Sequence, residues 1–177
     1  MSKVITESEV DFGPFQEDDL FHIEESQLYQ SLGAGLKTVE FIFLRNEGKN
    51  IVLLEAKKTC PNEENKEESE EKRIKYEEYF ADITQKVEDS VNVFIAAILG
   101  RYPDKEELGH NFYDKVHMRF AKLTFALVIT SPEAEEAWMM GPKAELERRL
   151  LRLRKIWKLD IVVINRTTAQ KRGLISV

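Results

Sequence analysis

The sequence has only one cysteine, Cys60, and it lacks any apolar run long enough to cross a membrane. A single cysteine excludes an intrachain disulfide bond, which favours a reducing compartment. Residues 1–10 are polar and include two glutamates, without the basic start and apolar stretch of a secretory signal. We therefore expect a cytoplasmic protein that makes no contact with a membrane.

A basic surplus, which is usual in dedicated nucleic-acid-binding proteins, is also missing, because the formal net charge of the 177 residues is −6. The charge is unevenly distributed, however. Residues 63–89 contain eleven acidic and five basic side chains, whereas residues 143–177 contain three acidic and ten basic ones. An acidic total therefore leaves room for a basic surface near the C-terminus.

Three common kinds of site are missing from the pattern as well. His22, His110 and His117 show no zinc-ligand spacing with one another or with Cys60, and no base can be paired with that thiol. No glycine-rich phosphate-binding motif is present. Zinc chemistry, thiol catalysis and P-loop nucleotide hydrolysis are therefore not expected.

Hydrophobic periodicity and turn residues predict one α/β domain over residues 1–177. The expected elements are an irregular segment at 1–19, a helix at 24–32, strands at 38–44 and 51–57, a charged loop at 62–75, a helix from 76 to 100, a loop at 101–114, a strand at 123–130, a helix at 134–158 broken near Gly141-Pro142, a strand at 160–165 and a basic tail. This order predicts a mixed sheet of four to five strands with flanking helices, an antiparallel central hairpin and parallel later strands.

The two strands of the hairpin bring charged side chains together at one end. If the polar loop between them closes symmetrically, with Leu44 opposite Ile51, then Glu40 falls opposite Glu55. Glu55 and Lys57 share a face because strand side chains alternate with a period of two. A slip of one residue would turn Glu40 to the other face. In the symmetric register, two carboxylates and one ammonium group converge.

Two buried carboxylates repel each other unless a cation lies between them. A hard divalent ion, Mg²⁺ or Mn²⁺, would relieve this repulsion through oxygen ligands, and it would polarise a phosphodiester and acidify a bound water. Lys57 would then orient or deprotonate that water, or stabilise charge on the phosphate. The opposing interpretation is a solvated hairpin end in which Lys57 simply pairs with a carboxylate.

Glu40, followed by Glu55-Ala56-Lys57 on the next strand and a long helix, resembles the PD-(D/E)xK nuclease superfamily, which has a restriction-endonuclease-like fold. The resemblance implies a magnesium-dependent nuclease that prefers DNA to RNA, with the metal held by Glu40, Glu55 and the Ala56 carbonyl and with Lys57 acting on the attacking water. It departs from the family in having Glu as the first acid, with no proline before it.

The same resemblance suggests further site residues and a second function. It implies an additional acid at Glu24 or Glu25 and a contribution from the long helix by Gln85 or Lys86. Some members of the superfamily have lost activity, so the alternative is an inactive nuclease-like interaction module within a larger complex, such as one that defends bacteria against foreign DNA. In either case we expect a partner protein or a homodimer, since a small nuclease core needs help to hold its substrate.

A basic stripe is the candidate surface for nucleic acid. Arg148, Arg152 and Lys155 recur at helical spacing within the predicted helix at 134–158, and phosphate contact is one interpretation of them. The other is an ordinary solvated face of a helix whose apolar residues point to the core.

Overall fold

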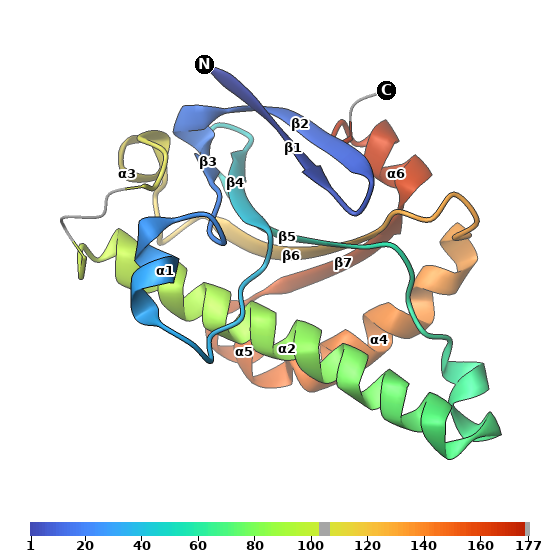
Figure 1. Ribbon diagram of the computed structural model, residues 1–177. Helices are drawn as coiled ribbons and strands as arrows, with labels where there is room; N and C mark the ends of the chain where they lie inside the picture. The colour runs from blue at the N-terminus through green and yellow to red at the C-terminus, as the bar shows by residue number, and fades with distance from the viewer. Residues whose placement is uncertain (103–106, 176–177) are drawn as a thin grey trace.

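The computed structural model describes residues 1–102 and 107–175, and its centre is a five-stranded sheet (Figure 1). The strands, in spatial order, are β3 (Leu20–Phe21), β4 (Phe41–Arg45), β5 (Asn50–Lys57), β6 (Lys122–Ile129) and β7 (Asp160–Asn165). β3, β4 and β5 pair antiparallel, whereas β5, β6 and β7 pair parallel. The predicted mixed sheet with a central hairpin is confirmed.

The register of that hairpin is the symmetric one. Leu44 pairs with Ile51, and the ladder continues in the same register to Phe41 and Leu54. The next position along β4 is Glu40, which lies just before the strand, and its counterpart in this register is Glu55. The hairpin therefore places the two carboxylates as the sequence predicts.

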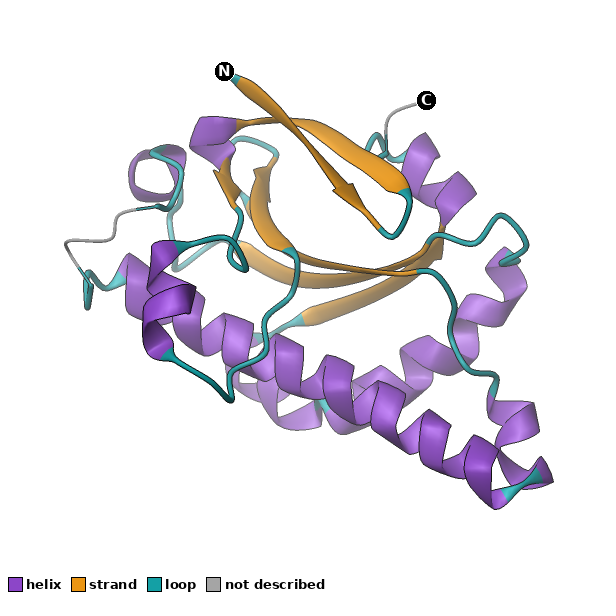
Figure 2. Ribbon diagram, in the orientation of Figure 1, coloured by secondary structure: helices purple, strands orange, loops and turns teal. Residues whose placement is uncertain are grey.

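Helices cover one face of the sheet (Figure 2). The helices are α1 (Gln27–Leu32), α2 (Glu70–Ile98), α3 (Asn111–Asp114), α4 (Met140–Arg149), α5 (Leu151–Trp157) and α6 (Arg166–Lys171). α2, α4 and α5 lie on one side of the sheet, and α6 lies on the other beside an N-terminal hairpin (Figure 1). None of the helices in the described part of the chain is long and apolar enough to cross a membrane.

The sheet separates two hydrophobic clusters because strand side chains alternate between its faces. On β5, Ile51 and Leu53 point toward α2, whereas Val52 and Leu54 point toward the N-terminal hairpin. The buried side chains of α2 recur at helical spacing and belong to the first cluster: Tyr76, Phe80, Ile83, Val87, Val91 and Phe94. Glu55 and Lys57, as odd-numbered residues of β5, therefore face α2.

The prediction of an irregular segment at residues 1–19 is wrong. Strands β1 (Ser2–Glu7) and β2 (Val10–Gln16) form an antiparallel hairpin, and a 3₁₀ turn, η1 (Glu17–Asp19), follows. Ser8 and Glu9 both adopt positive φ in the connecting turn, a conformation usually signalled by Gly or Asn. The hairpin is held by packing on the sheet, because the ring of Phe12 packs edge-on and the ring of Phe15 packs at a tilt against Phe41.

The predicted charged loop at residues 62–75 is also wrong. A 3₁₀ helix, η2 (Glu63–Glu68), leads directly into α2, whose first residues fall in this range. Asn62 and Ser69 cap these helices by accepting hydrogen bonds from the backbone N–H groups of Glu64 and Lys72. The charged side chains form ion pairs along the helix surface. High charge marks a solvated helix here.

The C-terminal helices also begin and end at unexpected residues. A 3₁₀ turn, η4 (Glu136–Met139), precedes α4, and Gly141-Pro142 lies in the first turn of α4, where proline is tolerated. The break in the predicted helix falls at Leu150, between α4 and α5. The basic tail forms α6, capped by Asn165, whose side chain accepts from the Thr168 N–H. Residues 103–106 of the predicted loop lie outside the described residues.

Candidate functional site

The candidate site lies where β5 ends, on the face of the sheet that α2 covers. The Glu55 side chain has no exposed surface, and Glu40 beside it is also buried. Lys57, two residues further along β5, places its Nζ 2.9 Å from Oε1 of Glu55. The structure thus brings together the three side chains that the sequence singles out as catalytic.

Lys86 of α2 occupies the centre of this group. Its Nζ lies 2.9 Å from Oε1 of Glu55 and 3.8 Å from Oε1 of Glu40. It also donates a hydrogen bond of 3.2 Å to the second oxygen of Glu55. A single ammonium group therefore contacts both buried carboxyl groups.

The structure also decides between the alternative residues suggested by the family resemblance. Glu24 joins the site, with Oε1 3.3 Å from Nζ of Lys86, whereas Glu25 pairs with Lys3 and His22 instead. On α2, Lys86 points into the site and Gln85 donates to the Gly35 carbonyl oxygen. Glu24 precedes α1, which begins at Gln27, so this acid comes from the turn before the helix.

Burial and mutual repulsion perturb the carboxylates. Burial, together with the nearby charges of Glu55 and Glu24, raises the pKa of Glu40 to about 8. Burial also raises the pKa of Glu55, against the opposing effect of Lys86 and Lys57. Burial disfavours the charged form of Lys86, but the three neighbouring carboxylates outweigh it and raise its pKa. At neutral pH, Glu40 therefore holds a proton while Lys86 stays charged.

The donor set suits a hard divalent cation. Oε1 of Glu55 is buried, and although two ammonium nitrogens lie 2.9 Å away, it receives no well-aligned hydrogen bond from any described group. Carboxyl oxygens of Glu40 and Glu24 lie nearby, because each contacts the same Lys86 ammonium group. Within residues 1–102 and 107–175, no three acidic, histidine or cysteine side chains are already drawn together in a metal-ligating arrangement. Lys86 now lies between these carboxyl groups.

The third predicted oxygen ligand, the Ala56 carbonyl, is engaged by the N-terminal hairpin. The Ser8 hydroxyl donates to it at 3.0 Å, and the backbone carbonyl oxygen of Ser8 accepts a hydrogen bond of 2.8 Å from the Thr130 hydroxyl. Glu9, also in the turn, pairs with Lys58 at 2.8 Å. The tip of the β1–β2 hairpin therefore closes one side of the site. A carbonyl oxygen has a second lone pair, so Ala56 remains a candidate ligand.

Two further acids belong to the surroundings of the site and were missed from the sequence. Asp82 lies one turn before Lys86 on α2, with Oδ2 4.0 Å from Nζ of Lys57 and Oδ1 2.6 Å from Nζ of Lys37. Its spacing of four residues from Lys86 was the available signal. Burial, together with Glu24 and Glu55, raises the pKa of Glu7 at the end of β1. Nothing in the sequence pattern foretold that approach.

The predicted nucleic-acid surface is divided between two helices. Arg148 lies on α4 and forms a bidentate ion pair with Glu145. The hydrogen bonds from Arg148 lower the pKa of Glu145 to about 2. Arg152 and Lys155 lie on α5 and are exposed. The helix break at Leu150 interrupts the stripe, so phosphate contact by these residues stays a prediction.

Comparison with known proteins adds no relative. Neither a family model, nor a curated protein, nor a solved structure matches this chain. The functional argument therefore rests on the geometry of the site.

Proposed function

We propose that this protein is a divalent-metal-dependent nuclease of the PD-(D/E)xK type, with a restriction-endonuclease-like fold and DNA preferred to RNA. The observation that supports the proposal most is the convergence of Glu40, Glu55 and Lys57 at the end of β5. The hairpin register that produces it was required by the motif and is the one present. Glu24 and Lys86 supply the additional acid and the helix residue that the resemblance implies.

The oxygens of Glu40 and Glu55, with the Ala56 carbonyl, would hold Mg²⁺ or Mn²⁺. When bound, such an ion polarises the phosphodiester and acidifies a water. The Lys57 side chain is more exposed than those of Glu40, Glu55 and Lys86, so its ammonium group can contact water and a phosphate oxygen. In the reaction the water oxygen bonds to phosphorus and gives up its proton to solvent, the P–O ester bond breaks, and the leaving oxygen takes up a proton from solvent. Lys57 would orient the attacking water.

Cleavage of labelled single- and double-stranded DNA and RNA, with Mg²⁺, Mn²⁺ or a chelator, tests this proposal. We expect metal-dependent cleavage by the wild type and its loss in Glu55→Gln. Glu25→Gln is the matched control, because Glu25 is an exposed acid paired with Lys3 and His22, away from Lys86. Retained cleavage in Glu55→Gln would contradict the proposal, since a contaminating nuclease would then account for the activity.

One observation favours the alternative of an inactive interaction module. Lys57 and Lys86 already neutralise the fully buried Glu55, and Lys86 fills the place a metal would need. Under this alternative, Mg²⁺ and Mn²⁺ leave the thermal unfolding midpoint unchanged and no substrate is cut. Under the nuclease proposal, metal raises the midpoint of the wild type and leaves that of Glu55→Gln unchanged.

A further inference from the structure

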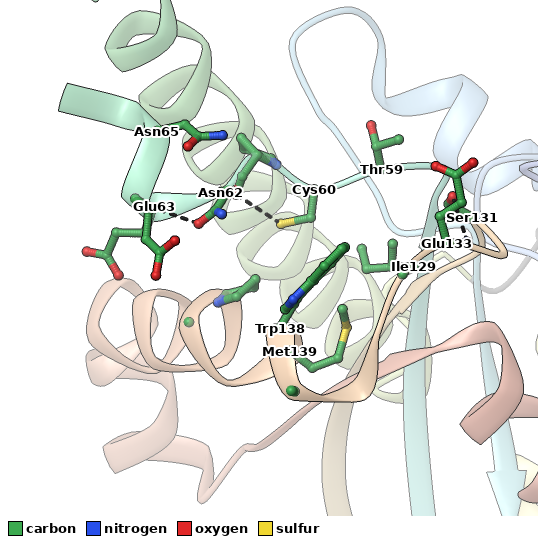
Figure 3. Close-up of a pocket in the computed structure, with 16 residues that line it drawn as sticks. Thr59, Cys60, Asn62, Glu63, Asn65, Ile129, Ser131, Glu133, Trp138 and Met139 are labelled. Carbon is green, nitrogen blue, oxygen red and sulfur yellow. Dashed lines mark hydrogen bonds between the residues drawn. The ribbon is translucent and has the colours of Figure 1, made fainter. Parts of the chain in front are cut away.

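A separate pocket of about 590 Å³ lies beyond the carboxyl ends of β5 and β6 (Figure 3). Residues 59–65, which follow β5, form one wall, and Ile129 with residues from 131 to 142 forms the other. The carboxyl ends of parallel strands are a common place for ligands in α/β sheets. The pocket begins two residues after Lys57, but its lining includes none of the carboxylates or lysines of the candidate active site.

An exposed tryptophan and apolar side chains form the body of the pocket. Trp138 is 60% exposed, which is unusual for so large an apolar ring, and Figure 3 shows its indole between Cys60 and Met139. Burial raises the pKa of the Cys60 thiol to about 11, so the Cys60 side chain beside Trp138 is uncharged at neutral pH. The pocket therefore offers a flat aromatic surface beside neutral, apolar neighbours.

The charges around this surface all have one sign. The described residues that line the pocket include Glu63, Glu64 and Glu133 and no lysine, arginine or histidine. Glu63 is paired with Lys66 at 3.0 Å. Glu64 and Glu133 are exposed, and no described basic side chain lies within ion-pair distance of either carboxylate. An anionic ligand such as a phosphate would be repelled here, whereas a cation would be attracted.

We propose that this pocket binds an organic cation, a guanidinium or alkylammonium group on an apolar stem. The stem would lie against the apolar wall while the charged group stacks on Trp138, attracted by the negative charge that Glu64 and Glu133 contribute on the two walls of the pocket. An arginine side chain of a partner protein and a free amine share this chemistry. The proposal is independent of nuclease activity, and binding alone tests it.

Fluorescence of Trp138 gives a direct reading of occupancy. The chain has two tryptophans, so Trp157→Phe, a change on α5, leaves Trp138 as the only tryptophan, and excitation at a wavelength that tyrosine does not absorb isolates its signal. The probes are N-acetylarginine methylamide, butylguanidine and the neutral isostere N-acetylcitrulline methylamide. We expect saturable quenching by the two cations and none by the citrulline derivative. Equal binding of both cations would indicate recognition of the cation alone, and tighter binding of the arginine derivative would indicate a protein side chain.

Paired double variants separate the pocket from bulk charge. Glu64→Gln with Glu133→Gln should weaken binding about fivefold or more, because each removes an attractive carboxylate. Glu135→Gln with Glu136→Gln makes the same change in net charge at acids that do not line the pocket, and should leave affinity unchanged. Equal weakening by both pairs, or equal binding of the citrulline derivative, would overturn the proposal. Tighter binding of adenosine than of either cation would overturn it too, and would assign a nucleobase site.

Discussion

Lys86 of α2 and Glu55 of β5 form an ion pair of 2.9 Å between residues that are 31 positions apart in the sequence. The same ammonium group lies 3.3 Å from Glu24 and 3.8 Å from Glu40. Lys86 is thus the common partner of three carboxyl groups that approach one another only in the folded chain. The stability of the site and its capacity for metal both depend on this arrangement.

Lys86→Met should destabilise the protein strongly at neutral and alkaline pH. Removing Lys86 leaves the fully buried Glu55 with Lys57 alone as its counter-ion, and incomplete compensation of a buried charge costs about 3 kcal/mol or more. The loss should shrink as pH falls, because burial raises the pKa of Glu55 and a protonated carboxyl group needs no counter-ion. Urea denaturation at several pH values measures this. Lys75→Met, which removes an exposed pair with Glu71 on the same helix, should cost much less, because water screens that pair. Equal losses in the two variants would refute the role given to Lys86.

Glu40 should make the protein less stable as pH rises. Its pKa is about 8 in the folded chain against an ordinary value of 4.5, so the folded state binds the proton more tightly. The resulting stabilisation is complete below pH 4.5 and is lost as pH rises toward and through about 8. The free energy of unfolding should therefore fall across this window in the wild type. Glu40→Gln, which cannot titrate, should show a shallower fall, and an identical slope would contradict the assignment.

Lys57→Met should separate activity from stability. Glu55 keeps Lys86 as a partner when Lys57 is removed, and the Lys57 side chain is partly exposed. We expect a loss of stability of about 1 kcal/mol, but a fall in cleavage rate of about 100-fold or more. Lys58→Met is the control, because Lys58 is the next residue along the chain and its ammonium group pairs with Glu9 on the N-terminal hairpin instead. A rate unchanged by Lys57→Met would remove Lys57 from the mechanism.

Phe12→Ala should destabilise the protein by about 3 to 5 kcal/mol, because a large ring would be deleted from the second cluster. Phe12 is 0% exposed and packs edge-on against Phe41 of β4. Val4→Ala, on the adjacent strand but 49% exposed, should change stability by about 0.5 kcal/mol or less. Thermal unfolding measures both. A small effect of Phe12→Ala would mean that the N-terminal hairpin contributes little to the core.

The sequence predicts the central hairpin well because two physical signals agree there. The polar loop between Leu44 and Ile51 closes symmetrically, and the two flanking apolar runs fit the centre of a sheet that is covered on both faces. The alignment of Glu40 with Glu55 follows from it. Asp160–Asn165 is likewise a short β-rich run with clear ends, and it forms β7 as predicted.

The N-terminal hairpin shows why other parts could not be predicted. Its turn places Ser8 and Glu9 at positive φ without Gly or Asn, so the usual turn signal is missing. Contacts between distant segments, such as Ser8 with Ala56, leave no periodic trace in the sequence. The choice of Glu24 over Glu25 depends in the same way on how the turn before α1 meets α2.

Binding of Mn²⁺ tests the central claim most directly, because it does not require the right nucleic-acid substrate. Calorimetric titration should show binding to the wild type that is tighter at pH 8.5 than at pH 6, since a metal must displace the proton that Glu40 holds with a pKa of about 8. Glu55→Gln should abolish binding, and Glu25→Gln should leave it unchanged. No binding at pH 8.5, or undiminished binding in Glu55→Gln, would contradict a metal site at the end of β5.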